Sequence, residues 1–101
     1  MSGTSDRARR KRRLLSLYGG RCFWCGKQMK VTPRAPTDRV TANEMTVDEL
    51  VPVSRGGRRR LDNQVPAHRI CNERRGAMIA SASDIERHQT TLAAALAQES
   101  A

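Results

Sequence analysis

Two pairs of metal-binding residues stand at matching spacing in this chain. Cys22 and Cys25 are separated by two residues, and His68 and Cys71 repeat that spacing further along. Three thiolates and one imidazole make a complete tetrahedral donor set for zinc, and the set uses every cysteine of the chain. The alternative is a thiol-redox Cys-x-x-Cys with an unrelated histidine, but residues 1–30 lack the βαβ context of such a site. The spacing therefore favours a structural zinc site.

A second set of residues offers oxygen ligands for a hard cation. Asp48 and Glu49 are adjacent carboxylates in a chain of formal net charge +9, and Asn63 and Asn72 follow them. Mg²⁺ keeps several waters and needs few protein oxygens, so one carboxylate and one amide suffice. The plainer alternatives are an exposed strand start for the acidic pair, turn chemistry for Asn63 and a helix N-cap for Asn72. On the acidic pair alone the strand start is preferred, and Asn63 and Asn72 favour a metal site through their match to the family pattern described below.

The elements that position the first half of these residues follow from local patterns. A helix is predicted over 6–17, with Asp6 at its N-cap and Leu14, Leu15 and Leu17 turning inward near its end. Residues 18–30 form a compact knuckle in which Gly26 allows the tight turn after the cysteine pair. Residues 31–45 are expected to be a loop, and the Val-rich stretch 46–53 a short strand.

The second half is expected to supply a strand and two helices. The stretch "SRGGRRRLDN" predicts a turn, and "QVPAHR" a second short strand. A helix is expected from Ile70 to Ala82. Ser83-Asp84-Ile85-Glu86 resembles a capping box that opens a last helix, whose apolar stripe is Ile85, Leu92 and Leu96. His88 stands alone on that helix and is expected at the surface.

The charge balance predicts an anionic polymer as partner, because the sequence pI is about 11.0. The positive excess lies in residues 1–80, and no apolar run is long enough to span a membrane. The odd, closely spaced cysteines favour metal ligation in an intracellular protein. The basic clusters are either solvated or in contact with phosphates, and their grouping favours phosphates. The candidates are Arg9, Arg10, Lys11, Arg12, Arg13, Arg58, Arg59, Arg60, Arg74 and Arg75.

Three stretches together carry a resemblance to a known family: "CFWCG", "VDELVPVSRGG" and "LDNQVPAHRICNERRG". Over roughly residues 13–78 the chain resembles the HNH endonucleases of the zinc-knuckle type. The resemblance implies an α+β fold, a small treble-clef-like ββα-metal domain stapled by zinc. We divide the chain accordingly into a basic N-terminal arm or helix at 1–12, the HNH domain at 13–82 and a C-terminal helix at 83–101.

The resemblance also implies roles for individual residues. Asp48 and Asn72 match the ligands of a catalytic Mg²⁺ or Mn²⁺, Asn63 matches the residue that braces the loop between the strands, and the Cys₃His set matches the structural zinc. Glu49 stands where the family usually has the histidine that acts as general base. A carboxylate is a weaker base than an imidazole but is available at neutral pH. Glu49 is therefore either the base or a second metal ligand. The family geometry implies a local bend that brings it and Asp48 to one phosphate.

Two functions follow as hypotheses. The first is a metal-dependent DNA endonuclease that cuts or nicks with low sequence specificity. The alternative is a zinc-stabilised DNA-binding module of the same fold that lost catalysis with the histidine. Retention of Asp48, Asn63 and Asn72 favours the enzyme. Small members of the family often belong to phages or mobile elements, and some work with DNA-packaging proteins, so the resemblance extends to those expectations. The protein would lie in the cytoplasm of a bacterial host if it is phage-encoded.

Overall fold

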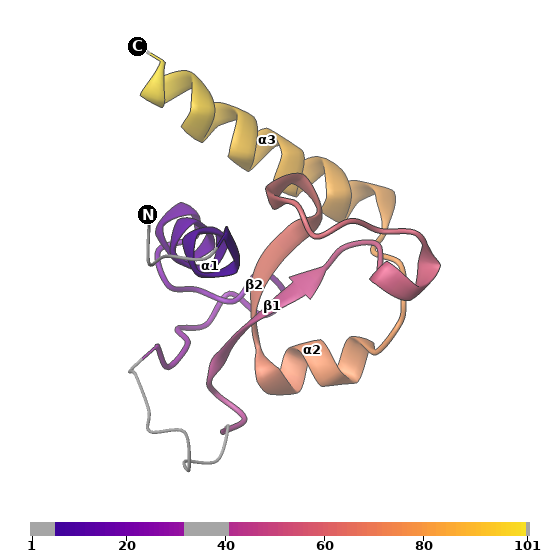
Figure 1. The fold of residues 1–101 in the computed structure, drawn as a ribbon. Coiled ribbons are helices and arrows are strands. Elements are labelled where there is room, and N and C mark those ends of the chain that lie inside the picture. The colour runs from indigo at the N-terminus through magenta and orange to yellow at the C-terminus, as the bar shows by residue number, and fades with distance from the viewer. Residues whose placement is uncertain (1–5, 32–40, 101) are drawn as a thin grey trace.

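The computed structural model describes residues 6–31 and 41–100; residues 1–5 of the expected arm and most of the expected loop at 31–45 lie outside this range. The main elements are α1 (Asp6–Leu17), β1 (Met45–Glu49), β2 (Gln64–His68), α2 (Arg69–Arg75) and α3 (Ala82–Glu99). In Figure 1 the two strands lie at the centre, with α2 below them, α3 above them and α1 at the left. The small α+β fold with a two-stranded antiparallel sheet confirms the expected fold class.

The hairpin places alternate residues of β1 on opposite faces. Its strands pair from Met45 opposite His68 to Glu49 opposite Gln64. Met45 packs into the core with Leu14 of α1. Thr46 and Asp48 face the other way and contact side chains of α2. One face of the hairpin is therefore covered by α1 and the other by α2.

The predicted strand over 46–53 is too long. β1 ends at Glu49, after which Leu50 turns into a core cluster with Phe23, Val65 and Ala80. Pro52 then precedes a short 3-10 turn at Val53–Arg55. Proline has no N–H to donate to a ladder, so the strand could not continue through it.

α1 spans the predicted residues, Asp6–Leu17, and is anchored through its last turns. Leu14 is fully buried with Cys22, Met29, Met45 and Ala67, while Leu15 and Leu17 are packed at the edge of that cluster. Burying one leucine side chain contributes about 1.5–3 kcal/mol. Because that cluster includes Cys22 of the knuckle, α1 also fixes the start of the candidate zinc site.

The helix predicted over 70–82 is wrong in its second half, because α2 ends at Arg75. Gly76 follows with a φ of 56°, a conformation that other residues rarely adopt. The backbone N–H of Ala80 then donates to the carbonyl of Leu50 at 2.8 Å, which ties this segment to the end of β1.

The last helix begins two residues earlier than the predicted capping box. Ser81 is its N-cap, with the side-chain oxygen accepting from the backbone N–H of Asp84 at 3.2 Å. Along its apolar stripe Leu92 is buried, but Leu96 is 49% exposed. Neither α3 nor any other helix within 6–31 and 41–100 is long and apolar enough to cross a membrane.

His88 is fully buried, so the expectation of a surface histidine is wrong. Its Nδ1 lies 2.6 Å from the hydroxyl of Tyr18, and its Nε2 lies 2.7 Å from the carbonyl oxygen of Leu61. A neutral ring satisfies both contacts: the Tyr18 hydroxyl donates to Nδ1, and Nε2–H donates to Leu61. These bonds fasten α3 to the end of α1 and to the loop between the strands.

Acid should therefore destabilise the fold through His88. Burial is the main cause that lowers the pKa of His88 below its usual value of 6.5. The neutral ring is favoured by folding, so its contribution is complete above the unfolded-state pKa and is lost as the pH falls below it. Chemical denaturation at a series of pH values should show a smaller acid loss for His88→Gln than for the parent.

The comparison between the two proteins isolates this residue, because acid also protonates zinc ligands in both of them. At pH 8 the variant should be less stable by about 1–3 kcal/mol, since buried hydrogen bonds are lost. Identical pH dependence of the parent and His88→Gln would show that the His88 ring does not carry this effect.

Candidate metal centre and active site

The four predicted zinc ligands converge on one point. The sulfurs of Cys22, Cys25 and Cys71 and a ring nitrogen of His68 all lie within 4.8 Å of one another. The first two come from the knuckle after α1, where Gly26 has a φ of 76° and donates its N–H to Cys22 at 2.9 Å. The other two come from the end of β2 and the first turn of α2. The donor set and its closeness fit a tetrahedral zinc ion.

The His68 ring is already oriented for this role. Its Nε2 lies 2.8 Å from the carbonyl oxygen of Gln28, so Nε2 carries the proton and donates. Its Nδ1 faces the sulfurs, 3.3 Å from Cys25. A metal-binding histidine commonly donates its other ring N–H to a carbonyl in this way.

The pKa values of two of these thiols are shifted in opposite directions. A backbone N–H bond from Lys27 lowers the pKa of Cys25 to about 7. Desolvation and the nearby charge of Cys22 raise the pKa of Cys71 to about 12. Three thiolates at one point therefore repel one another, and a dication in their midst would favour all three anionic forms. The residues present suit zinc on this chemical ground as well as on geometry.

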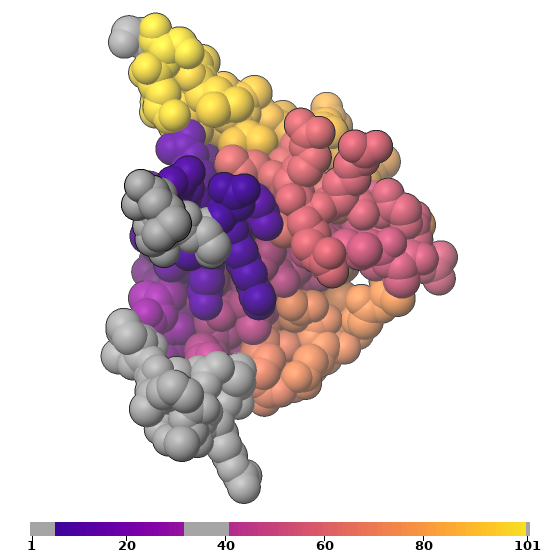
Figure 2. Space-filling model, in the orientation of Figure 1, coloured from indigo at the N-terminus to yellow at the C-terminus, as the bar shows by residue number. Residues whose placement is uncertain are grey.

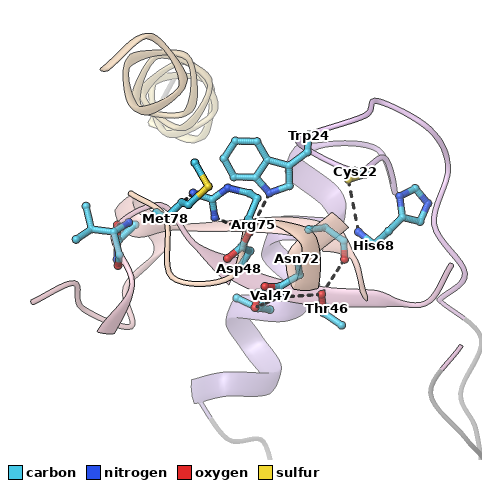
Figure 3. Close-up of polar contacts among 12 residues, drawn as sticks. Cys22, Trp24, Thr46, Val47, Asp48, His68, Asn72, Arg75 and Met78 are labelled. Carbon is cyan, nitrogen blue, oxygen red and sulfur yellow. Dashed lines mark hydrogen bonds and ion pairs between the residues drawn. The ribbon is translucent and has the colours of Figure 1, made fainter. Parts of the chain in front are cut away.

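Asp48 is buried and paired with a cation from α2. Its Oδ2 accepts from a guanidinium nitrogen of Arg75 at 2.9 Å and from the indole Nε1–H of Trp24 at 3.0 Å. Burial raises the pKa of Asp48, and both partners oppose that shift. Figure 3 shows the Arg75 and Trp24 side chains next to each other and above the Asp48 carboxylate.

Asn72 reaches the same face. It lies within α2, whose N-cap position is His68, so the N-cap interpretation of Asn72 is wrong. The Asn72 amide nitrogen donates to Thr46 Oγ1 at 3.1 Å and to the carbonyl of Val47 at 3.3 Å. Val47 immediately precedes Asp48, and Figure 3 shows the Asn72 and Asp48 side chains next to each other. No hydrogen bond to the Asn72 Oδ1 comes from the described residues.

Asn63 lies in the loop between the strands and bonds to that loop at three points. Its Oδ1 accepts from the N–H of Val51 at 2.9 Å, and its amide nitrogen donates to the carbonyls of Val51 and Arg58, each at 2.9 Å. The Gly-Gly turn fits under this brace. A Cβ on Gly57 would lie 1.7 Å from the Val51 carbonyl oxygen, so no larger residue is accommodated there without displacing the loop.

Glu49 does not join Asp48. Both residues stay in regular pairing with β2, so the expected bend is absent and the strand alternation holds. Glu49 accepts from the Gln64 amide at 3.3 Å and lines a groove of about 840 Å³ beside α1. Gln64 also lines this groove, and its buried Oε1 has no hydrogen-bond partner among the described residues.

Positive charge surrounds this groove. Arg7, Arg10, Lys11 and Arg59 line it together with Glu49. Figure 2 shows the indigo side chains of α1 next to the pink segment that follows β1. Of the other predicted phosphate contacts, Arg9, Arg12, Arg58, Arg60 and Arg74 are exposed.

Two predicted phosphate contacts are paired within the chain. Arg13 pairs with Glu99, and Arg75 pairs with Asp48. Trp24 and Gln64 also lie at these sites but were not predicted as site residues. The position of Trp24 between Cys22 and Cys25 was the one feature of the sequence that could have indicated its role. The pairing of Gln64 with Glu49 depends on the register of the strands, which the sequence does not give.

Comparison with known proteins agrees with this geometry. The family model described as HNH endonuclease matches residues 22–77, a segment that contains both cysteine pairs, the acidic pair, the braced loop and Asn72. No curated protein and no solved structure matches the chain. Since the family model covers more than half of the residues, the chain belongs to the HNH endonuclease family.

Proposed function

We propose that this protein is a metal-dependent DNA endonuclease that cuts or nicks with low sequence selectivity. The observation that carries the proposal is the placement of Asp48 and Asn72 on one face of the hairpin. The Asn72 amide nitrogen bonds to the residue that precedes Asp48, and Asp48 bonds to Arg75, so the Asn72 and Asp48 side chains both lie on the face of the hairpin that α2 covers. Membership of the HNH family, whose domains generally act on DNA, makes phosphodiester hydrolysis the matching reaction.

Two oxygen donors fit Mg²⁺ or Mn²⁺, since such ions keep most of their water and bind few protein groups. Asp48 and Asn72 would hold the ion, which would neutralise charge on the scissile phosphate and leaving oxygen. The Cys₃His centre would hold a separate zinc that fixes the start of α2. Its thiolates are soft ligands, and the two sites would therefore select different metals.

The chain's own groups supply the remaining tasks. Glu49 would accept the proton of the attacking water, or else serve as a second metal ligand, and either role requires β1 to bend at its end because Glu49 and Asp48 lie on opposite faces of the regular strand. Its carboxylate lies in a groove where four basic side chains would neutralise a phosphate backbone. Asn63 and Gly57 would keep the loop that follows Glu49 in place.

Two observations favour the alternative of a DNA-binding module without catalysis. Arg75 already neutralises Asp48, and the regular strand keeps Glu49 on the other face. Under this alternative the same basic groove would hold DNA and no bond would be broken.

A phage or mobile-element source and DNA-packaging partners rest on the resemblance alone.

A plasmid assay separates the two functions. Zinc-loaded protein should convert supercoiled plasmid to nicked or linear DNA with Mg²⁺ or Mn²⁺ present, and EDTA added briefly should stop the reaction. Asn72→Ala should slow cleavage by about a hundredfold, because it removes an oxygen ligand and 10²-fold losses are usual when positioning fails. The extent of plasmid conversion is measured on agarose gels over time.

The matched control is Asn43→Ala, the same change at an exposed residue of the turn before β1. It should cleave like the parent. DNA binding in a gel-shift assay without cleavage under any divalent metal would reject the endonuclease and support the binding module.

A further inference from the structure

The Arg75 guanidinium lies near the candidate site and is fixed there by three contacts. One nitrogen donates to Asp48 at 2.9 Å, and another donates to the carbonyl oxygen of Met78 at 2.9 Å. The guanidinium carbon lies 4.0 Å from the centre of the Trp24 ring, so the charge also stacks on an aromatic face. Figure 3 shows Arg75 at the point where these contacts meet, with Trp24, Asp48 and Met78 around it. The side chains of Arg75 and Asp48 are only 14% and 7% exposed.

The packing of Arg75 against Asp48 affects how Asp48 can bind a second cation. A carboxylate this deeply buried is stable as an anion only beside a cation, and here Arg75 is that cation. A divalent ion on the same carboxylate would stand close to the guanidinium, and like charges at short range in a poorly solvated site repel strongly. The two cations therefore compete for Asp48.

We infer that Arg75 is the resident counter-ion of Asp48 and sets how tightly the site takes up a divalent cation. Arg75 is thus a positioning residue that opposes metal binding, a role distinct from the direct phosphate contact predicted from the sequence. The inference rests on the proposed function, because it takes Asp48 as a ligand of the catalytic cation.

The competition can be measured without catalysis. Trp24 is the chain's one tryptophan and its indole donates to Asp48, so excitation of Trp24 should sensitise the luminescence of Tb³⁺ bound there. Tb³⁺ is a hard cation that prefers oxygen ligands and leaves the thiolate centre to zinc. Zinc-loaded protein is titrated with Tb³⁺, and Mn²⁺ is then added as a competitor.

Arg75→Gln should bind Tb³⁺ and Mn²⁺ more tightly than the parent by about tenfold or more, within the usual range of coupling between two ligands of one site. Arg74→Gln is the matched control, because it removes the same charge from the neighbouring exposed residue of α2. The control should leave metal affinity nearly unchanged. Equal effects in the two variants, or weaker binding by Arg75→Gln, would overturn the inference.

Two further variants keep the result decisive. If Arg75→Gln loses its zinc or its circular dichroism spectrum, Arg75→Lys is titrated instead. Lysine keeps the charge without the planar fork and should raise affinity by a smaller factor, and a decrease would reject the inference. Asp48→Asn should abolish the sensitised signal. Absence of Tb³⁺ binding in the parent and in every variant would reject the metal site of the proposed function itself, whereas equal binding by the parent and Arg75→Gln would reject only the role of Arg75.

Discussion

Replacing His68 by alanine, or Cys71 by serine, should abolish zinc binding and the cooperative unfolding transition together. These two residues lie at the end of β2 and in the first turn of α2, and with the knuckle cysteines they join three segments at one point. Structural zinc contributes about 10–16 kcal/mol of apparent binding energy, as much as the whole stability of a typical domain. Zinc content by mass spectrometry and thermal melts measure both effects.

The other histidine provides the control. His88→Gln should keep one zinc per chain, because the His88 ring bonds to Tyr18 and Leu61 rather than to the thiolate centre. A His68→Ala protein that melts like the parent in the presence of a strong chelator would contradict the ligand assignment.

Glu49→Ala should fold, bind zinc and bind DNA, yet cleave slower than the parent by about a hundredfold or more if Glu49 is the general base. Glu49→Gln should be equally slow, since it keeps the shape and loses the basicity. Glu49→His should retain measurable cleavage. Its rate should fall earlier on the acidic side, because an imidazole takes up a proton at higher pH than a carboxylate does. Single-turnover rates on plasmid at several pH values give these comparisons.

The rival role for Glu49 gives a different pattern. If Glu49 is a second metal ligand, high Mg²⁺ or Mn²⁺ should restore much of the rate of Glu49→Gln. Glu44→Gln is the matched control, because Glu44 is another carboxylate of the same groove and should matter little to the rate. Full cleavage by Glu49→Ala at ordinary metal concentration would leave the acidic pair without a catalytic base.

The cluster of Cys22, Cys25, His68 and Cys71 was predictable because each ligand pair is a local pattern. The two ligands of each pair are separated by two residues, and this spacing can be seen in the sequence without knowledge of how the rest of the chain folds. The helix at 6–17 was predictable for the same reason, since its leucines cluster at one end of a stretch without glycine or proline. Patterns of this kind need no knowledge of distant partners.

The environment of the second site was not predictable in this way. Asp48 meets Arg75, and His88 meets Tyr18, only through folding of segments far apart in the chain. A lone histidine among polar residues of a helix gives no sign that a tyrosine and a carbonyl will enclose it. The early end of α2 depends on Gly76 and its positive φ. A glycine can be expected to end a helix, but the helix-forming residues on both sides of Gly76 favoured a longer helix in the prediction.

The contacts of α1 and α3 also bear on whether the family segment can be transferred to another protein. Leu14 completes one core cluster, and His88, on α3, joins Tyr18, which packs against the other. Both Leu14 and His88 lie outside residues 22–77, the segment that matches the family. A polypeptide restricted to that segment would contain the candidate zinc ligands and the site residues, but apolar surface would be exposed on both of its sides. Transfer of this segment into a new protein would therefore succeed only where the recipient supplies two covering helices of its own.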